Sequence, residues 1–462
     1  HEDHIGAVQY LWPRLRCPIY TTPFTGSVLR RKLTETKFGS EVEIIEVSLG
    51  ARFHIGNFDL ELVTLTHSIP EPNAIALRTP LGTVLHTGDW KFDPNPVIGK
   101  PADEQKLRQI GEEGTLAVVG DSTNVFMEGD AGSESDILNN LSEVISSCTG
   151  QVAVACFASN VARLETITKA AMRNKRDVVL AGRSLKRMIE AARENSYLES
   201  LPAFLQEEDA GYLPDDKTLI ICTGSQGEPR AALSRIASED HPRIDLKRGD
   251  TVIFSSRIIP GNEQDIFDLQ AKFVRRGIKV ITNENVMIHV SGHPARDELA
   301  RMYQHLKPKI AIPVHGEFRH LKEHAALART CQIPHTIVNE NGGIIRLAPG
   351  APEIIDNVPV GRLVLDGNRL IPVDSEVIKD RTRVMWHGFA VITVILNHGE
   401  IGEEIPISTS GILENTNDPI LEAVRISVRL AINKLLNSSD KADDKAVSEA
   451  ARIAARRTFH DF

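Results

Sequence analysis

The sequence has few cysteines, and they follow no pattern. The five are Cys17, Cys148, Cys156, Cys222 and Cys331, and no two of them form a CxxC pair. An odd number of scattered cysteines in a chain of 462 residues argues against a disulfide framework. We therefore expect a protein of a reducing compartment, the cytoplasm.

Long apolar runs and internal repeats are also missing. The most apolar stretch is Phe389 to Leu396, whereas a helix that crosses a bilayer needs roughly 18 to 20 such residues. We expect neither a membrane protein nor a repeat protein. Apolar residues make up 41% and charged residues 25% of the chain, which is typical of a soluble globular protein. The length suits two or three domains.

The formal net charge of -9 weighs against nucleic-acid binding unless basic side chains gather locally. Three clusters offer such local charge: residues 173–176, Arg183 with Lys186 and Arg187, and Lys272 with Arg275 and Arg276. A run of like charge is more often the solvated face of a helix. These clusters are therefore candidates for a nucleic-acid path, with solvated helix faces as the alternative.

The two ends of the sequence look incomplete. It begins at His1, inside a motif of histidines and an aspartate, with no initiator methionine or leader before it. It stops directly after a helical pattern in which Ala450, Ile453 and Ala454 share one face. We expect that further segments of the protein precede His1 and follow Phe462.

Strand patterns dominate the first part of the chain. Apolar residues alternate in 42–47 and 58–63, which predicts hairpins between residues 42 and 67. Two more strands are expected at 83–86 and 116–120, and each is followed by an aspartate, Asp89 and Asp121.

Strands and helices alternate in the middle of the chain. Strands are expected at 152–157, 178–182, 218–223, 251–255 and 279–282, with helical patterns between them. This alternation predicts a parallel sheet flanked by helices, Rossmann-like in its layers. A helix at 295–305, a strand at 310–314 and a helix at 319–328 follow. A small tail domain has strands around 390–396 and a helix at 419–436.

Histidines and aspartates stand at the expected ends of several strands. His1, Asp3 and His4 form an HxDH pattern at an expected turn, and imidazole with carboxylate suits a divalent metal. His67, Asp89 and His315 each follow an expected strand. Each alone has a plain explanation as a polar turn residue. Loops at one edge of a sheet can bring such residues together, so the set predicts a binuclear metal site.

Longer motifs carry a resemblance to a known family. They are HEDHIGA (1–7), LTHSIPE (65–71), HTGDWKFD (86–93), GDSTN (120–124), HVSGH (289–293) and IPVHGE (312–317), together with FASN (157–160), CTGSQGEP (222–229) and SSRIIPGNE (255–263). In this order and at these spacings they resemble the motifs of the bacterial ribonuclease J family, β-CASP nucleases of the metallo-β-lactamase fold. No Gly-Lys-Ser/Thr follows the glycines at 224–227, so a nucleoside-triphosphatase loop is excluded.

The resemblance implies an α/β fold: an αββα metallo-β-lactamase sandwich with an inserted Rossmann-like β-CASP domain and a small α/β C-terminal domain. The boundaries it suggests are 1–133 for the first part of the core, without its N-terminal strands, 134–285 for the β-CASP domain, 286–373 for the second part of the core, and 374–462 for a linker and a shortened C-terminal domain. The active site is expected in the cleft between the core and the β-CASP domain.

The resemblance also implies a ligand set for two divalent ions, zinc or manganese, with magnesium as an alternative. His1 and His67 would hold one ion, and Asp3, His4 and His315 the other. Asp89 would bridge the two. The first histidine of the family motif would lie two positions before residue 1.

Three residues are expected to take part in the reaction beyond metal binding. Asp3 is expected to accept the proton of the attacking water, and His293 to contact the scissile phosphate as an acid or as a stabiliser of charge. Asp121 is expected to orient a metal-binding histidine. The plainer alternatives are a structural loop histidine for His293 and a turn cap for Asp121.

The family's activity implies hydrolysis of RNA phosphodiesters by a metal-bound hydroxide, 5′→3′ from 5′-monophosphate ends, with endonuclease cleavage besides, in RNA maturation and decay. Ser159, Asn160, Ser291, Gly292 and His293 are the candidates for binding the RNA phosphate; the alternative for these polar residues is ordinary loop polarity. The partners expected are single-stranded RNA, a second copy of the chain in a homodimer or tetramer, and proteins of RNA decay, with no membrane. Two alternatives stay open: a hydrolase of small carbonyl substrates, and an RNA-binding subunit with an inactive metal site.

Overall fold

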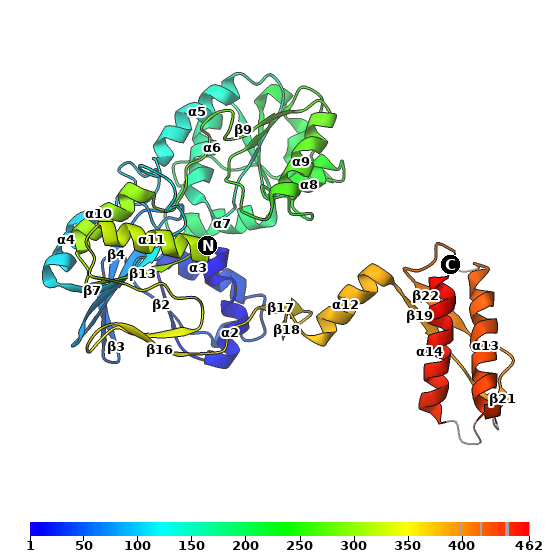
Figure 1. The fold of residues 1–462 in the computed structure, drawn as a ribbon. Coiled ribbons are helices and arrows are strands. Elements are labelled where there is room, and N and C mark those ends of the chain that lie inside the picture. The colour runs from blue at the N-terminus through cyan, green and yellow to red at the C-terminus, as the bar shows by residue number, and fades with distance from the viewer. Residues whose placement is uncertain (398–399, 416–417, 439–442, 462) are drawn as a thin grey trace. The chain divides into compact units, whose positions relative to one another are not determined.

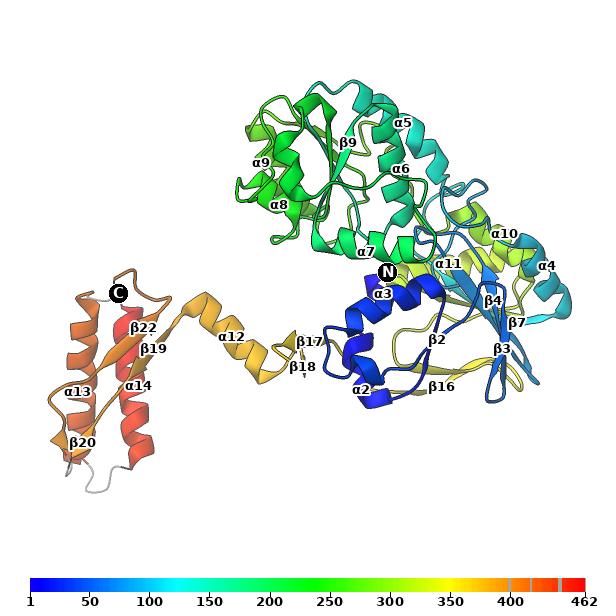
Figure 2. The same ribbon diagram turned by 180° about the vertical axis from the view of Figure 1, so that it is seen from behind.

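The computed structural model describes residues 1–397, 400–415, 418–438 and 443–461. The chain divides into two compact units, residues 1–359 and residues 360–462, each described by itself below. Figures 1 and 2 show the two from opposite sides. Within the described ranges, every helix is too short or too polar to span a membrane.

A seven-stranded sheet forms the centre of the first unit. Its order is β14-β13-β7-β6-β5-β4-β3. The strands are β3 (Arg52–Ile55), β4 (Phe58–Thr64), β5 (Asn73–Thr79), β6 (Gly82–His86), β7 (Thr115–Asp121), β13 (Ile310–Val314) and β14 (His335–Thr336). Pairing is antiparallel from β3 to β6 and parallel from β6 to β14. Consequently β4, β6, β7 and β13 all run in one direction, and their carboxyl ends lie at the same edge.

Both faces of this sheet are covered. On one face pack α4 (Glu104–Glu113), α10 (Arg296–Leu306) and α11 (Phe318–Thr330), whose apolar side chains form one core with Leu85 and Val118. The residue before Val118 in β7, Ala117, belongs to a core on the other face, with Ile310 and Ile312. This alternation follows from the two-residue period of a strand. It fixes the register of the sheet and therefore the positions of the loops at its carboxyl edge.

The inserted part of the first unit is a parallel sheet between two helical layers (Figure 1). Its order is β12-β11-β8-β10-β9, made of β8 (Val152–Ala155), β9 (Asp177–Ala181), β10 (Thr218–Cys222), β11 (Thr251–Phe254) and β12 (Lys279–Ile281). Helices α5 (Glu134–Ser146), α6 (Val161–Arg173) and α7 (Arg183–Glu194) share a core with Val152 and Val154, whereas α8 (Ala232–Ala237) and α9 (Glu263–Arg275) share one with Ala153 and Ala155. The expected Rossmann-like layering is confirmed.

The N-terminal segment differs from the expectation in two places. It consists of α1 (Glu2–Ile5), α2 (Val8–Leu15), β1 (Ile19–Thr21), α3 (Pro23–Leu33), the 3-10 turn η1 (Gly39–Glu41) and β2 (Ile44–Glu46). The expected turn at residues 1–4 is wrong, because Glu2–Ile5 is helical. Residues 42–47 do not form a hairpin either, since β2 pairs in parallel with β1. Helix α3 lies between these strands, and such a crossover brings the second strand back in the same direction.

The remaining elements of the first unit are 3-10 turns at Glu207–Tyr212 and Asp215–Lys217 and a hairpin of β15 (Gly343–Arg346) and β16 (Glu353–Asn357). The second unit contains β17 (Leu363–Asp366), β18 (Arg369–Pro372), α12 (Glu376–His387), β19 (Phe389–Ile392), β20 (Leu396–Asn397), β21 (Glu400–Ile401), β22 (Ile407–Ser410), α13 (Ile420–Ser438) and α14 (Asp444–His460). Val424, Val428 and Ile432 of α13 form its core with Val447 and Ala451 of α14. The second unit is thus a small α/β domain. The boundaries at 133, 285 and 373 stay predictions.

Candidate metal centre

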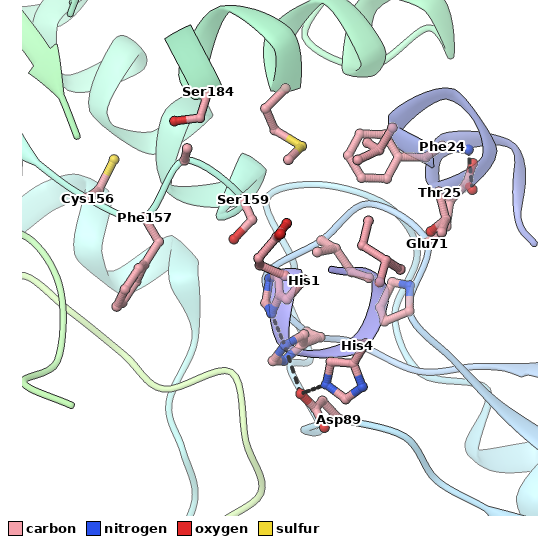
Figure 3. A pocket seen from close by; sticks show the side chains of 18 of the residues that line it. His1, His4, Phe24, Thr25, Glu71, Asp89, Cys156, Phe157, Ser159 and Ser184 are labelled. Carbon is pink, nitrogen blue, oxygen red and sulfur yellow. Dashed lines mark hydrogen bonds and ion pairs between the residues drawn. The ribbon is translucent and has the colours of Figure 1, made fainter. Parts of the chain in front are cut away.

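The carboxyl edge of the seven-stranded sheet gathers the histidines and aspartates that the motifs singled out. His67 follows β4, Asp89 follows β6, Asp121 ends β7, and His315 follows β13. These four strands run in the same direction, so their final residues and the loops after them meet. The segment around α1 adds His1, Asp3 and His4 to the same edge. Figure 3 shows His1 and His4 near Asp89.

One group of donor atoms comes from His1, His67 and Asp89. His67 Nε2 lies 3.2 Å from His1 Nδ1 and 3.9 Å from Asp89 Oδ2. His67 Nδ1 donates to the carbonyl oxygen of Gly292 at 2.5 Å, so His67 Nε2 keeps its lone pair. His1 Nε2 lies 2.9 Å from Ser68 Oγ. Burial lowers the pKa of His67 to about 4, which keeps this imidazole neutral at pH 7.

A second group comes from Asp3, His4, Asp89 and His315. His315 Nε2 lies 3.7 Å from Asp3 Oδ2 and 3.6 Å from Asp89 Oδ1, and Asp89 Oδ2 accepts from His4 Nε2 at 2.9 Å. Asp89 therefore presents one oxygen to His315 and the other to His4 and to the first group. His315 adopts a positive φ of 59°, a conformation that non-glycine residues rarely adopt and that recurs at functional sites.

The separations within both groups fit divalent ions. Nitrogen and oxygen ligands lie about 2.0 to 2.2 Å from zinc, so two ligands of one ion are about 3 to 4 Å apart. The distances of 3.2 to 3.9 Å between His67 and its neighbours and of 3.6 and 3.7 Å around His315 fall in this range. Imidazole with carboxylate suits zinc or manganese, and a carboxylate that faces both groups suits a two-ion site.

Negative charge dominates the second group. The pKa of His315 is raised to about 10 because Asp121 and Asp3 lie beside its ring. The His315 contact, against the effect of burial, holds the pKa of Asp3 well below its usual range. The hydrogen bond to Asp89 raises the pKa of His4. Protons on two imidazoles thus balance carboxylates here, and a divalent cation can replace them.

His293 lies between the two groups, with its ring centroid 5.1 Å from that of His67 and 5.5 Å from that of His315. Its Nδ1 donates to Asp121 Oδ2 at 2.7 Å. The other oxygen of Asp121 lies 3.4 Å from His315 Nδ1. Burial favours a neutral Asp121, but its contacts with the two histidines outweigh that effect and hold its pKa well below the usual range. One buried carboxylate therefore orients two imidazoles.

A cavity of about 580 Å³ joins this centre to the inserted part of the chain. His1, His4 and Asp89 line one side, and Figure 3 shows Ser159 and Ser184 on the other. The inserted side is formed by residues after the carboxyl ends of β8, β9 and β10, namely Phe157, Ala158, Ser159, Ser184, Thr223, Gly224 and Ser225. Ligands of open parallel sheets bind at this end of the strands. The cavity is of a size that takes a small ligand.

The residues expected to bind phosphate do not all line the cavity. Ser159 lines the cavity. Asn160 is buried, and its side-chain oxygen accepts from Arg163 N at 2.8 Å, so that it caps α6. The carbonyl oxygen of Gly292 contacts His67, and Ser291 Oγ accepts from the Asn124 side chain at 2.7 Å. These polar atoms support the protein's own framework.

Some arginines of the basic clusters bond within the protein, whereas others line a depression of the surface. Arg176 is buried and donates to backbone carbonyls of Gly150 and Thr218, which overturns its placement on a nucleic-acid path. Arg276 likewise donates to carbonyls within the inserted part. Arg183 and Arg187, in contrast, line a second depression that shares Ser184 with the large cavity.

Three residues were missed by the motif-based assignment of roles. Thr123 Oγ1 lies 2.9 Å from His315 Nδ1 and donates to Asp121 at 2.7 Å, and Ser68 contacts His1. Both stand next to assigned residues within quoted motifs, and this adjacency was the available clue. Ser184 lies outside every motif, and only the fold brings it to the cavity.

Comparisons with known proteins agree with this architecture. A family model described as "Ribonuclease J, beta-CASP domain" matches residues 149–272, and one described as "Zn-dependent metallo-hydrolase RNA specificity domain" matches residues 277–338. A ribonuclease J of Sinorhizobium meliloti is 45% identical over 86% of this chain and 70% of its own length. Those of Corynebacterium glutamicum and Thermus thermophilus are 34% and 36% identical over 92% and 88% of this chain, and over 60% and 72% of their own lengths.

The fold class expected from the motifs is thereby confirmed: a metallo-β-lactamase-type core carries an inserted β-CASP domain. The donor groups at the carboxyl edge of the core sheet suit divalent metal ions. With 45% identity to a relative of which it covers more than two thirds, the chain belongs to the ribonuclease J family.

Proposed function

We propose that the chain hydrolyses RNA phosphodiesters in the 5′→3′ direction from 5′-monophosphate ends, and that internal cleavage occurs at the same site. The observation that carries this proposal is the shared cavity: metal-ligand candidates line one side, and small hydroxyl and backbone groups of the inserted domain line the other. We expect hydroxyl groups such as those of Ser159 and Ser184 on the second side to bind phosphate oxygens, which every nucleotide carries, and this suits an enzyme that degrades many sequences.

Two divalent cations would be held by His1, His67 and Asp89 and by Asp3, His4, Asp89 and His315. When bound, they supply Lewis acidity, which activates water and stabilises charge on the attacked phosphate.

The chain's own groups have distinct roles in this proposal. Asp3 is ionised, since its pKa is lowered, and it accepts a proton from the attacking water. Attack on phosphorus in line with the 3′ oxygen breaks the bond to that oxygen. The phosphate then remains on the 5′ carbon of the downstream product. Asp3→Asn keeps the shape of the side chain, and activity unchanged by it would remove this role.

In this proposal His293 contacts the scissile phosphate. Asp121 holds the Nδ1 proton of His293, so Nε2 is the nitrogen left for the substrate. It stabilises charge on the phosphate or protonates the leaving 3′ oxygen. Asp121 itself is a positioning residue in this scheme, because its oxygens are directed at His293 and His315.

The test is degradation of uniformly labelled single-stranded RNA that bears either a 5′-monophosphate or a 5′-triphosphate, by the full-length protein with added Mn²⁺ or Zn²⁺ and with chelator. We expect metal-dependent release of 5′-mononucleotides, faster from the monophosphorylated RNA. Equal rates on both RNAs would contradict the proposed preference for 5′-monophosphate ends. Binding of RNA without cleavage under every metal would favour the alternative of an inactive binding subunit.

The family model for RNA specificity favours RNA over a small carbonyl substrate. Hydrolysis of thioesters or lactones with no action on RNA would reverse this choice. A homodimer or tetramer, partner proteins of RNA decay and the cytoplasm as the site of action stay predictions.

A further inference from the structure

Two motifs of the inserted domain contribute nothing to the candidate metal groups, yet they reach the site through one arginine. Arg257, in the motif at residues 255–263, follows β11 and donates from its guanidinium to Asn124 Oδ1. Asn124 lies after β7 of the core and is 3% exposed. The contact therefore joins the inserted domain to the core directly beside Asp121.

Both the oxygen and the nitrogen of the Asn124 carboxamide form hydrogen bonds. Its Nδ2 donates to Ser291 Oγ at 2.7 Å and to the carbonyl oxygen of His293 at 3.0 Å. Ser291 Oγ in turn lies 3.2 Å from the backbone nitrogen of His293 and accepts from it. Asn124 thus fixes the backbone of the segment that carries His293, while Asp121 fixes its ring.

Arg257 fixes the orientation of the Asn124 carboxamide. A guanidinium can only donate, and the carbonyl oxygen of His293 can only accept. With Arg257 on one side, the oxygen of Asn124 faces Arg257 and its nitrogen faces Ser291 and His293. Without Arg257, a flipped carboxamide would direct its oxygen at the carbonyl oxygen of His293.

Gln226, from the motif at residues 222–229, holds the arginine segment. Its Nε2 donates to the carbonyl oxygen of Arg257 at 2.9 Å, and its Oε1 accepts from Ile259 N at 2.9 Å. Gln226 is 5% exposed, so these bonds are shielded from water. A continuous chain of hydrogen bonds therefore runs from Gln226 through Arg257 and Asn124 to His293.

We infer that Asn124 and Arg257 are positioning residues for His293, and that Arg257 acts through Asn124. This inference rests on the proposed hydrolysis of RNA, and it deepens that proposal by giving the inserted domain a part in aligning the reacting groups. Arg257 is exposed and lines a separate cavity of about 490 Å³, so the competing role is a direct contact with the RNA. The two roles predict different results.

The test is a double-mutant cycle on the full-length, metal-loaded enzyme with 5′-monophosphorylated RNA. Asn124→Ala is expected to lower kcat about 10- to 100-fold, the scale of a misplaced reacting group. Arg257→Ala is expected to lower kcat less, with KM and metal affinity unchanged. The double variant is expected to be no slower than Asn124→Ala alone, because the two residues act in series. Arg257→Lys, which keeps a donor, is expected to recover part of the loss.

Arg235→Ala is the matched control, because this arginine of the inserted domain contacts the backbone and side chain of Asp240 and lies outside both cavities. Its kcat is expected to match that of the unaltered enzyme. If thermal melting shows that Arg257→Ala is unfolded, Arg257→Lys takes its place in the cycle. Independent, multiplicative losses, or a raised KM with kcat unchanged, would overturn the inference and leave the proposed function intact. Absence of metal-dependent cleavage by the unaltered enzyme would overturn both.

Discussion

Asp121 gives the sharpest prediction about the metal centre. Its side chain is buried, one oxygen accepts from His293 and the other faces His315 Nδ1 at 3.4 Å. Asp121→Asn keeps the shape but removes the negative charge beside His315 Nδ1. A neutral carboxamide holds the proton on Nδ1 less strongly than a carboxylate does, so the imidazole form whose proton sits on Nε2, the nitrogen that faces Asp3, gains population.

We expect Asp121→Asn to lower the affinity for one of the two ions only. Loss of an outer partner of a metal-binding histidine lowers metal affinity about 10- to 100-fold, or roughly 1.4 to 2.7 kcal/mol at 1.4 kcal/mol per factor of ten. The ion at Asp3, His4 and His315 should therefore bind more weakly, while the ion at His1 and His67 should bind as before.

Both affinities can be measured by adding metal to the metal-free protein in competition with a chromophoric chelator. Asp250→Asn is the matched control, since Asp250 is also a buried carboxylate but accepts from backbone groups of the inserted domain. Its metal affinities should stay unchanged. If Asp121→Asn bound two ions as tightly as the unaltered protein, the orienting role of Asp121 would be refuted.

Three more perturbations follow from particular contacts. A Cβ at Gly292 would lie 2.5 Å from the His67 ring, so Gly292→Ala should weaken the ion on the His67 side, seen in the same chelator titration. Arg163 is fully buried against Glu134, so Arg163→Met should lower the free energy of unfolding in urea by about 3 to 5 kcal/mol, and Arg163→Met with Glu134→Gln should recover part of that loss. The pKa of His315 is raised to about 10 in the metal-free site, so its imidazole is protonated at pH 7. Metal binding should therefore release protons, and the metal affinity should increase as pH rises. Calorimetry in buffers of different ionisation enthalpy detects the released protons.

The sequence predicts the parts of the site that local patterns carry. His67, Asp89 and His315 each follow an expected strand, loops at one edge of a sheet can bring such residues together, and the structure brings them together there. The turn expected at residues 1–4 failed because a four-residue stretch has too little periodicity to separate a turn from a helical turn.

The links between distant motifs could not be predicted in the same way. Gly292 binds the His67 ring across 225 positions of sequence, and Arg257 meets Asn124 across 133. Neither contact leaves a local pattern, because each joins segments that only the tertiary fold brings together. Arg176 shows the converse, since its position in a basic run suggested a surface and the fold buries it among carbonyl groups.

The most direct test of the account is the rate of RNA cleavage by metal-stripped full-length protein as Mn²⁺ or Zn²⁺ is added in measured equivalents. We expect no cleavage without metal and a rate that rises to a plateau at about two ions per chain, as a two-ion site requires. Full cleavage by the stripped protein in chelator, or no cleavage of RNA at any metal content by a folded protein, would contradict the account.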